Sequence, residues 1–258
     1  RARDAELLGL LVAMTHIYLA VGSSGAPALD AWDWDARPIN LLCAFPFVST
    51  LRHWWKPRRL MLDSGAFSVW NSGGSVDLEA LTRESLMPRW TESVSLDAIG
   101  DWQGSKANAI KMRALGSPAM PVFHVGDPWE LLDFYCEHWP KVGLGGMVGA
   151  PKKQVGNWLA SVFARAWPHR FHSFGMTDPN VLFRFPFHSA DSSTWCSLGR
   201  FGRVIGSGQG MHHVRQIYTL QGAPGQAYLA MIPHYIRQFC NLEDHLKIHW
   251  ARTLKELE

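Results

Sequence analysis

The chain has 258 residues, of which 47% are hydrophobic and 18% are charged, with a formal net charge of +3 and four cysteines. This length is sufficient for one α/β barrel, and the balance of apolar and charged residues excludes a disordered or supercharged chain. The cysteines are few and far apart, which excludes a disulfide-stabilised scaffold and favours a reducing cytoplasm.

The positive charge is concentrated in the second half of the chain. Residues 138–242 include ten lysines and arginines but only two acids, a net charge of +8. A basic segment of this kind is typical of a protein that binds a polyanion, and nucleic acid is the first candidate. The alternative is an ordinary uneven surface.

The N-terminal region lacks the features of a targeting segment. The apolar run 7–21 is shorter than the roughly 20 residues of a membrane span. The polar residues before it carry both signs of charge, unlike a secretory signal. We therefore expect a cytoplasmic protein with no membrane partner. We interpret residues 1–13 as a leader, non-native or flexible, because the chain does not start with Met and Met14 directly precedes a predicted strand.

Short apolar, β-rich runs alternate with longer amphipathic stretches along the chain. Eight runs are predicted strands, at residues 17–21, 41–45, 60–63, 94–97, 119–124, 142–147, 170–175 and 187–191. Five predicted helices lie between them, at residues 77–91, 105–115, 127–139, 152–166 and 178–185. Asp or Pro at their starts is typical of helix caps and first turns, namely Asp77, Asp127-Pro128, Pro151 and Asp178-Pro179.

This alternation predicts a parallel sheet whose strands are buried on both faces. Eight strands in this length favour a single (β/α)₈ TIM barrel over an open doubly wound sheet. No Gly-x-Gly-x-x-Gly follows the first strand, so a dinucleotide fold lacks its main support. The glycine-rich segment 206–210 has no Lys-Ser/Thr of a phosphate loop and is expected to be a connecting turn. One domain covering residues 1–258 is the simplest organisation.

Barrel active sites lie at the C-terminal ends of the strands, so the polar residues closing each predicted strand are the candidates. Three acids are among them, namely Asp63, Asp191, and either Asp97 or Asp101. Crowded carboxylates titrate apart, which gives one ionised nucleophile and one protonated acid, as glycosidic-bond chemistry requires. The alternative is that each Asp only caps a helix or forms a turn.

Two of these acids have surroundings that favour a functional role. Asp63 precedes Ser64 and Gly65, small residues that leave room for a ligand, and Asp191 is isolated in the basic segment. A packed core histidine is the alternative for His124 at the end of another predicted strand. No cysteine spacing matches a zinc site.

Several of these segments resemble the tRNA-guanine transglycosylase superfamily. Leu-Asp-Ser-Gly-Ala-Phe-Ser at 62–68 resembles its Asp-Ser-Gly-Gly-Phe-Gln, and Gly-Gly-Met-Val-Gly-Ala-Pro-Lys at 145–152 resembles its Gly-Gly-Leu-Ala-Val-Gly-Glu-Pro-Lys. Val-Phe-His-Val-Gly at 122–126 is similar to its Ile-Val-Gln-Gly-Gly, with His124 in place of a base-binding Gln. Asp191 falls where the family carries its nucleophile. The segments match in order over most of the chain.

The departures from the tRNA enzymes are equally specific. Their Cys-x-Cys-x-x-Cys…His zinc site and appended RNA-binding domain are both missing from this sequence. Asp191 is followed by Ser-Ser-Thr-Trp instead of Cys-Val-x-Pro-Thr-Arg. This compact form looks more like the DpdA group, which inserts 7-deazaguanines into DNA and has short members in phages. The resemblance therefore implies a transglycosylase-like barrel without a zinc subdomain and, if the source is viral, a location in the host cytoplasm.

The resemblance implies a pentosyltransferase that replaces guanine in DNA by a 7-deazaguanine of the 7-cyano type. Asp191 would attack C1′ to form a covalent intermediate, and Asp63 would be the general acid and base. The target nucleotide must leave the base stack. The exchange requires neither a catalytic metal ion nor a redox cofactor. The partners are then DNA and a free 7-deazaguanine base. The implied base-binding residues are Ser64, Phe67, Asp97, Asp101, His124, Gly145, Gly146, Met147 and His172. The expected phosphate-binding residues are Lys152, Lys153, Arg184, Arg200 and Arg203.

Three alternatives remain open from the sequence. The first is a tRNA transglycosylase of the same superfamily. The second is a nucleic-acid-binding barrel without catalysis, and the third is a metal-dependent hydrolase that uses His124, His172 and Asp191. The sequence specifies neither the oligomeric state nor which 7-deazaguanine is inserted.

Overall fold

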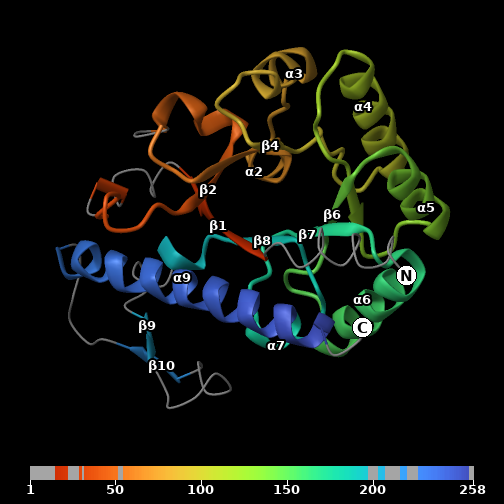
Figure 1. Ribbon diagram of the computed structural model, residues 1–258. Helices are drawn as coiled ribbons and strands as arrows, with labels where there is room; N and C mark the ends of the chain where they lie inside the picture. Colours follow the sequence, from red (N-terminus) through yellow and green to blue (C-terminus); the bar gives the residue numbers. More distant parts are fainter. Residues whose placement is uncertain are drawn as a thin grey trace.

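Eight parallel strands form one sheet with helices around its outside (Figure 1). The computed structural model describes residues 15–22, 29–30, 32–51, 55–196, 203–206, 216–219 and 226–255. The strands are β1 His16–Val21, β2 Asn40–Ala44, β3 Arg59–Asp63, β4 Glu92–Ser93, β5 Val122–His124, β6 Lys141–Gly145, β7 Arg170–Ser173 and β8 Ser189–Ser192. Their order in the sheet is β4-β3-β2-β1-β8-β7-β6-β5.

The two edge strands of this sheet are joined to each other. Val94, directly after β4, forms a parallel bridge with Met120, directly before β5. The Ser95 amide donates to the Met120 carbonyl at 2.9 Å, and the Met120 amide donates to the Ser93 carbonyl at 2.9 Å. The eight strands therefore close on themselves, which confirms the predicted barrel.

The helices follow the strands in the order that the alternation predicts. The helical elements are the 3₁₀ helix η2 Phe45–Thr50, α2 Ala66–Asn71, α3 Leu78–Ser85, α4 Trp102–Ala114, α5 Trp129–His138, α6 Lys152–Ala166, α7 Pro179–Leu182 and α9 Gln226–Lys255. Two further strands, β9 Arg203–Gly206 and β10 Gln216–Thr219, pair antiparallel. The glycine-rich turn expected at 206–210 lies largely outside the described residues, as does the leader expected at 1–13.

All five predicted helices are present, most of them shorter than expected. Asp77 and Asp178 cap α3 and α7 with their carboxylates, as predicted. Asp127 does not cap α5, because its side chain accepts a hydrogen bond from the backbone of His124 and Pro128 takes the cap position. The fourth strand was expected at 94–97 but consists of Glu92 and Ser93.

Alternate residues of each strand pack into two separate clusters. Ile17 and Leu19 of β1 belong to the larger cluster, which includes many helix residues, whereas Tyr18 between them belongs to the smaller one. The smaller cluster fills the barrel and consists of Tyr18, Leu42, Met61, Val94, Met120 and Val122. This alternation is the period of two expected for strands covered on both faces.

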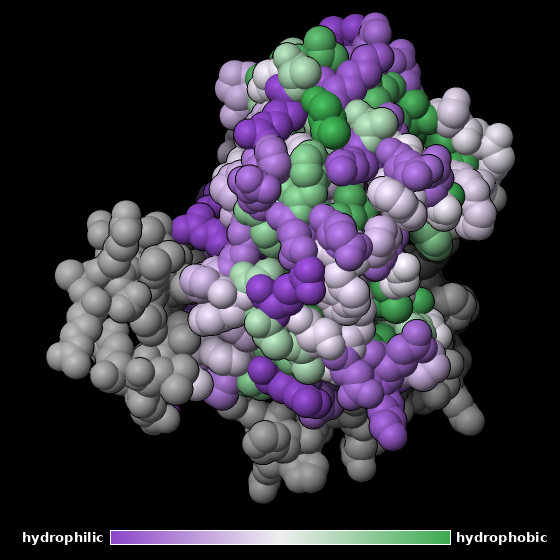
Figure 2. Space-filling view, turned by 90° about the vertical axis from the view of Figure 1, so that its right-hand side faces the viewer, coloured by the Kyte–Doolittle hydropathy of each residue, from purple (hydrophilic) through white to green (hydrophobic). Residues whose placement is uncertain are grey.

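One side of the barrel has a predominantly polar surface. Figure 2 shows the side of the molecule that lies on the right in Figure 1, where polar residues are spread widely and apolar residues form smaller groups between them. Helices α3, α5 and α6 bury apolar residues, among them Leu81, Leu132 and Leu159, whereas α2 exposes Phe67 and Trp70. None of the helices among the described residues is long and apolar enough to cross a bilayer.

Candidate active site

Strand β8 carries Asp191 near the C-terminal end of the barrel, where it is 6% exposed. Its Oδ1 accepts hydrogen bonds from the Gly175 amide at 2.9 Å and from His172 Nε2 at 3.2 Å. The indole of Trp195, four residues later, donates to the Ala20 carbonyl at 2.9 Å and fixes the chain after β8 against β1. Asp191 therefore has a defined orientation set by two neighbouring strands.

Asp63 ends β3 and is half-buried. The pKa of its carboxyl is raised to about 6, mainly by burial; the charges of Asp191 and Asp97 add to the rise, and the hydrogen bond from the Gly65 amide opposes it. That hydrogen bond is 2.9 Å long. Asp63 ends β3, Asp97 follows β4 by four residues and Asp191 lies in β8, so the three acids stand at the same, C-terminal end of the barrel.

Asp97 is held by two side chains. Its Oδ2 lies 3.0 Å from Nε2 of His124, and its Oδ1 accepts a 2.6 Å hydrogen bond from the Ser105 hydroxyl. The ring of His124 also lies 3.7 Å from Asp127. Burial disfavours the imidazolium, but the carboxylates of Asp127 and Asp97 outweigh it and raise the pKa of His124 to about 9. His124 is thus a cation at neutral pH.

Asp101 has a different position from Asp97. Its carboxylate accepts hydrogen bonds from the amides of Gln103 and Gly104 and caps α4 at an exposed position. The sequence did not separate these two acids, whereas the structure joins Asp97 to His124 and gives Asp101 a capping role. The predicted base-binding role therefore suits Asp97 and not Asp101.

Two glycines of the predicted motif lie against His124. A Cβ on Gly145, the last residue of β6, would be 2.6 Å from the His124 ring, and one on Gly146 would be 3.2 Å from the Val125 amide. Gly146 also has a φ of +73°, a left-handed conformation that favours glycine. The absence of side chains here lets the backbone after β6 approach β5 closely.

The remaining predicted base-binding residues have varied environments. Ser64 is buried and its hydroxyl accepts from the Ala66 amide, while Phe67 on α2 is 66% exposed. His172 is completely buried beneath Asp191, so it supports that carboxylate and does not cover a base. Met147 is 1% exposed within the outer cluster. Its contact with a base stays a prediction, and in this structure apolar neighbours surround its side chain.

Three of the predicted phosphate-binding residues belong to one part of the surface. Lys152 and Lys153 begin α6 and are exposed, as is Arg184. A Cβ on Gly156 of α6 would lie 3.8 Å from the Arg184 guanidinium, so this arginine is adjacent to the same helix. Lys152 lies 3.7 Å from Asp178. Arg200 lies outside the described residues, and Arg203 is described only as part of β9.

A buried group of charges at the opposite, N-terminal end of the strands was not predicted. Glu92 accepts hydrogen bonds from the Tyr18 hydroxyl at 2.8 Å and from Arg59 at 3.0 Å, and it pairs with Lys141. Although burial would raise the pKa of Glu92, Lys141 holds it well below its usual value. Burial in turn lowers the pKa of Lys141 to about 8 against the attraction of Glu92. The sequence did not indicate this group because candidates were sought only at the C-terminal ends of the strands.

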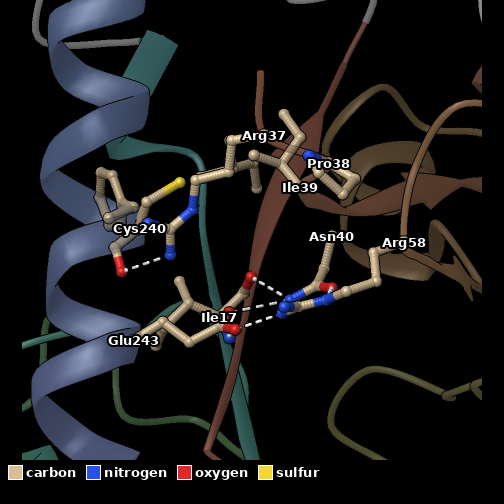
Figure 3. Close-up of a pocket in the computed structure, with 10 residues that line it drawn as sticks. Ile17, Arg37, Pro38, Ile39, Asn40, Arg58, Cys240 and Glu243 are labelled. Carbon is tan, nitrogen blue, oxygen red and sulfur yellow. Dashed lines mark hydrogen bonds and ion pairs between the residues drawn. The ribbon is translucent and has the colours of Figure 1, made fainter. Parts of the chain in front are cut away.

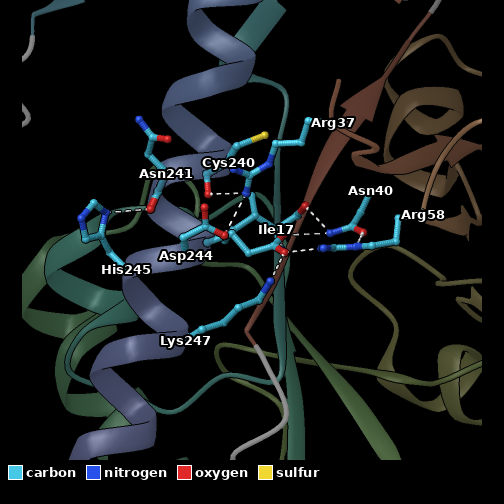
Figure 4. A network of polar contacts seen from close by, with 10 residues as sticks. Ile17, Arg37, Asn40, Arg58, Cys240, Asn241, Asp244, His245 and Lys247 are labelled. Atoms are coloured by element: carbon cyan, nitrogen blue, oxygen red, sulfur yellow. Dashed lines mark hydrogen bonds and ion pairs between the residues drawn. The ribbon is translucent and has the colours of Figure 1, made fainter. Parts of the chain in front are cut away.

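A small cavity lies between β1, β2 and α9 (Figure 3). Its volume of about 10 Å³ is near the space of one water molecule, so a nucleobase does not fit. Glu243 of α9 dominates this region, accepting hydrogen bonds from the Ile17 amide, Asn40 and Lys247 and pairing with Arg58 (Figure 4). These contacts fix α9 to the start of β1 and β2.

The candidate site does not match a metal centre. Among the described residues, no group of three or more His, Cys, Asp or Glu side chains has an arrangement that could hold a metal ion. His124 is engaged by two carboxylates, and His172 lies behind Asp191. The metal-dependent hydrolase considered from the sequence therefore has no support from these side chains.

Comparison with known proteins identifies the fold. Neither a family model nor a curated protein matches this sequence. A mutant tryptophan synthase alpha-subunit from the hyperthermophile Pyrococcus furiosus is similar at a TM-score of 0.51 and 12% identity, over 88% of this chain and 98% of that one. A protein from Aquifex aeolicus VF5 is similar at a TM-score of 0.52 and 11% identity, over 96% of this chain and 99% of that one. At these identities the likeness shows the barrel fold alone.

Proposed function

We propose that this protein is a DNA base-exchange enzyme that replaces guanine by a 7-deazaguanine through a covalent link between Asp191 and C1′. The observation that carries the proposal is the position of Asp63, Asp97 and Asp191 at or just beyond the C-terminal ends of β3, β4 and β8, where the charges of Asp97 and Asp191 contribute to the raised pKa of Asp63. Two of them have contrasting environments, as the division between a proton donor and a nucleophile requires.

In the first half-reaction, a carboxylate oxygen of Asp191 attacks C1′ from the face opposite the base. The C1′–N9 bond breaks, its electron pair goes to the departing guanine, and protonated Asp63 supplies the proton. A pKa of about 6 places Asp63 close to the range where it can both give and take a proton. An ester between Asp191 and the deoxyribose remains.

In the second half-reaction, the 7-deazaguanine enters the vacated position. Asp63, now ionised, takes the proton from its N9, and N9 attacks C1′ and displaces the Asp191 carboxylate. Two inversions give net retention at C1′. Asp97 accepts hydrogen bonds from N1–H and the exocyclic amine of the base, and His124 and the backbone at Gly145 and Gly146 read its other edge.

The substrate is a nucleotide outside the base stack. A base within a duplex does not reach an acid group recessed in a barrel, so the target is flipped out or single-stranded. Phe67, four residues after Asp63, has a ring that is 66% exposed, and in this proposal the ring covers the base. Lys152, Lys153 and Arg184 supply positive charge for the flanking phosphates.

The test is incorporation of a labelled base. The protein is incubated with radiolabelled guanine or 7-cyano-7-deazaguanine and, in parallel, with DNA or unmodified tRNA. We expect label in DNA, no label with Asp191→Ala, and a covalent protein–DNA adduct when the entering base is omitted. Label in tRNA alone would identify the RNA enzyme instead. Salt-sensitive binding without any exchange would identify a non-catalytic nucleic-acid-binding barrel.

A further inference from the structure

The carboxylate of Asp191 is held through one of its two oxygens. Oδ1 accepts from the Gly175 amide at 2.9 Å and from His172 Nε2 at 3.2 Å. Within the described residues, no hydrogen bond reaches Oδ2. Gly175 has a φ of +63°, and this turn directs its amide toward Asp191. One oxygen is thus fixed while the other remains available to react.

The protonation of His172 follows from its surroundings. The side chain is completely buried, and burial, together with the charge of Lys141, lowers its pKa despite the hydrogen bond to Asp191. The ring is therefore neutral at neutral pH and carries one proton. An ionised carboxylate only accepts, so this proton is on Nε2, and Nδ1 accepts from the Ser189 hydroxyl at 2.7 Å. Ser189, His172 and Asp191 form a line of hydrogen bonds in that order.

These are the residue types of a serine-hydrolase triad, but their depth is reversed. In such a triad the serine faces the substrate and the carboxylate is buried behind the histidine. Here Ser189 is completely buried at the start of β8, and Asp191 lies two residues nearer to the C-terminal end of the barrel. Ser189 is therefore the inner end of the line and cannot be the nucleophile.

We infer that Ser189 and His172 are positioning residues that hold Asp191 in the orientation for attack on C1′, an inference that rests on the proposed function. The Ser189 hydroxyl fixes the tautomer of His172, and His172 fixes Oδ1, which leaves Oδ2 directed at the substrate. When Oδ2 forms the ester, Oδ1 becomes its carbonyl oxygen and keeps both donors. When the entering base displaces Asp191, the same donors stabilise the returning negative charge.

Variants at His172 distinguish the effect of its hydrogen bond to Asp191 from the effect of packing by its ring. His172→Phe keeps an aromatic ring but removes the donor, and we expect a 10- to 100-fold slower formation of the protein–DNA adduct, about the loss for a hydrogen bond to a charged group. The KM for the entering base should not change. His172→Gln restores a donor and should recover most of the rate. His138→Gln on α5 is the control and should match the wild type.

The role of Ser189 is tested by the tautomer itself. In ¹⁵N-labelled protein, the ring of His172 should carry its proton on Nε2 at neutral pH, and Ser189→Ala should increase the population with the proton on Nδ1 and slow adduct formation. Equal rates for His172→Phe and His172→Gln, or a proton on Nδ1 in the wild type, would overturn the inference. Absence of any exchange by the wild type would instead overturn the proposed function, and the NMR measurement would then decide whether the hydrogen-bonded line exists.

Discussion

Asp63 and Asp191 are the same residue type at the ends of two strands, and their neighbours distinguish them. Asp191 accepts hydrogen bonds from a backbone amide and a histidine, which together hold one oxygen of its carboxylate. Asp63 has the Gly65 amide as a donor but is buried beside two other acids, and its pKa rises to about 6. In the proposed mechanism, these different surroundings assign the two identical side chains opposite tasks, proton donor for Asp63 and nucleophile for Asp191.

The first prediction concerns the pH dependence of guanine release. If protonated Asp63 supplies the proton to the departing base, single-turnover formation of the Asp191 adduct should fall as the pH rises through about 6. Asp63→Asn cannot give a proton and should lower this rate by about 100-fold or more. Quenched-flow measurement of released guanine from about pH 5 to about pH 8, a range on both sides of this pKa, checks both expectations. A rate that is flat over this range would exclude Asp63 as the acid.

The sequence predicts the polar residues at the ends of strands, but it does not predict the side chains that hydrogen-bond to them. Asp63, Asp191 and His124 could be selected from the sequence because position at a strand end and residue type together are informative. Ser189 and Ser105 were not, because a serine acquires its role only from the side chain that tertiary structure places beside it. For the same reason the sequence could not choose between Asp97 and Asp101.

At the scale of elements, the close approach of β6 to β5 depends on Gly145. A methyl group there would lie 2.6 Å from the His124 ring and 3.1 Å from Val122, and His124 is itself held by two acids. We predict that Gly145→Ala displaces the ring from Asp97 and destabilises the fold by about 1–3 kcal/mol through overpacking. Base exchange should fall accordingly.

The stability of Gly145→Ala should also depend less on pH than the stability of the wild type. The folded-state pKa of His124 is about 9, above the ordinary 6.5, so its ion pairs stabilise the wild type fully below 6.5 and are lost as the pH rises through 9. Gly145→Ala should show a smaller loss over this range in chemical denaturation. Gly22→Ala is the control, because nothing lies within 4 Å of a Cβ at that position. An equal loss of stability in both variants would contradict the packing argument.

The strands were predictable and the last helix was not, for a physical reason. Strands buried on both faces are short apolar runs that stand out between polar helices. Helix α9 contains Pro233 within it, and proline ordinarily ends a helix, so the local pattern argues against a single element from Gln226 to Lys255. What stabilises α9 is tertiary contact with the barrel, including the network around Glu243.

We predict that Glu243→Gln destabilises the protein by about 3 kcal/mol or more, because it leaves buried donors without their anionic partner. Although burial opposes ionisation, Lys247, the Ile17 amide and Arg58 hold the pKa of Glu243 below its ordinary value. Its contribution is therefore present at neutral pH and is lost on acidification. Urea denaturation at neutral and acidic pH measures both effects.

Asp244, the next residue on α9, provides the matched control. It pairs with Arg37 at 2.8 Å, and the two side chains are 47% and 36% exposed. Exposed ion pairs contribute at most about 1 kcal/mol, so Asp244→Asn should be close to the wild type. If the two variants lost the same stability, the network around Glu243 would not be what anchors α9.

At the scale of the whole molecule, the uneven charge of the sequence bears on how a polyanion would approach. The basic segment 138–242 includes the strands that carry His172 and Asp191, and α6 begins with two exposed lysines. Nucleic-acid binding through such residues releases counterions, so the logarithm of the binding constant falls with the logarithm of salt concentration by about 0.9 for each phosphate contacted.

The last prediction uses this slope. The double variant Lys152→Ala with Lys153→Ala should weaken binding of single-stranded DNA uniformly across sequences. The salt slope should fall by about 0.7 to 1.4, because each lost phosphate contact to a single strand contributes about 0.7. Lys111→Ala on α4 is the control, since Lys111 lies outside the basic segment with its side chain 57% exposed and 3.8 Å from Glu79. Fluorescence anisotropy at several salt concentrations measures all three proteins. The acid beside Lys152 is Asp178 and not one of the three candidate catalytic acids, so exchange at saturating DNA should be retained. Unchanged slopes would place the DNA path on another face.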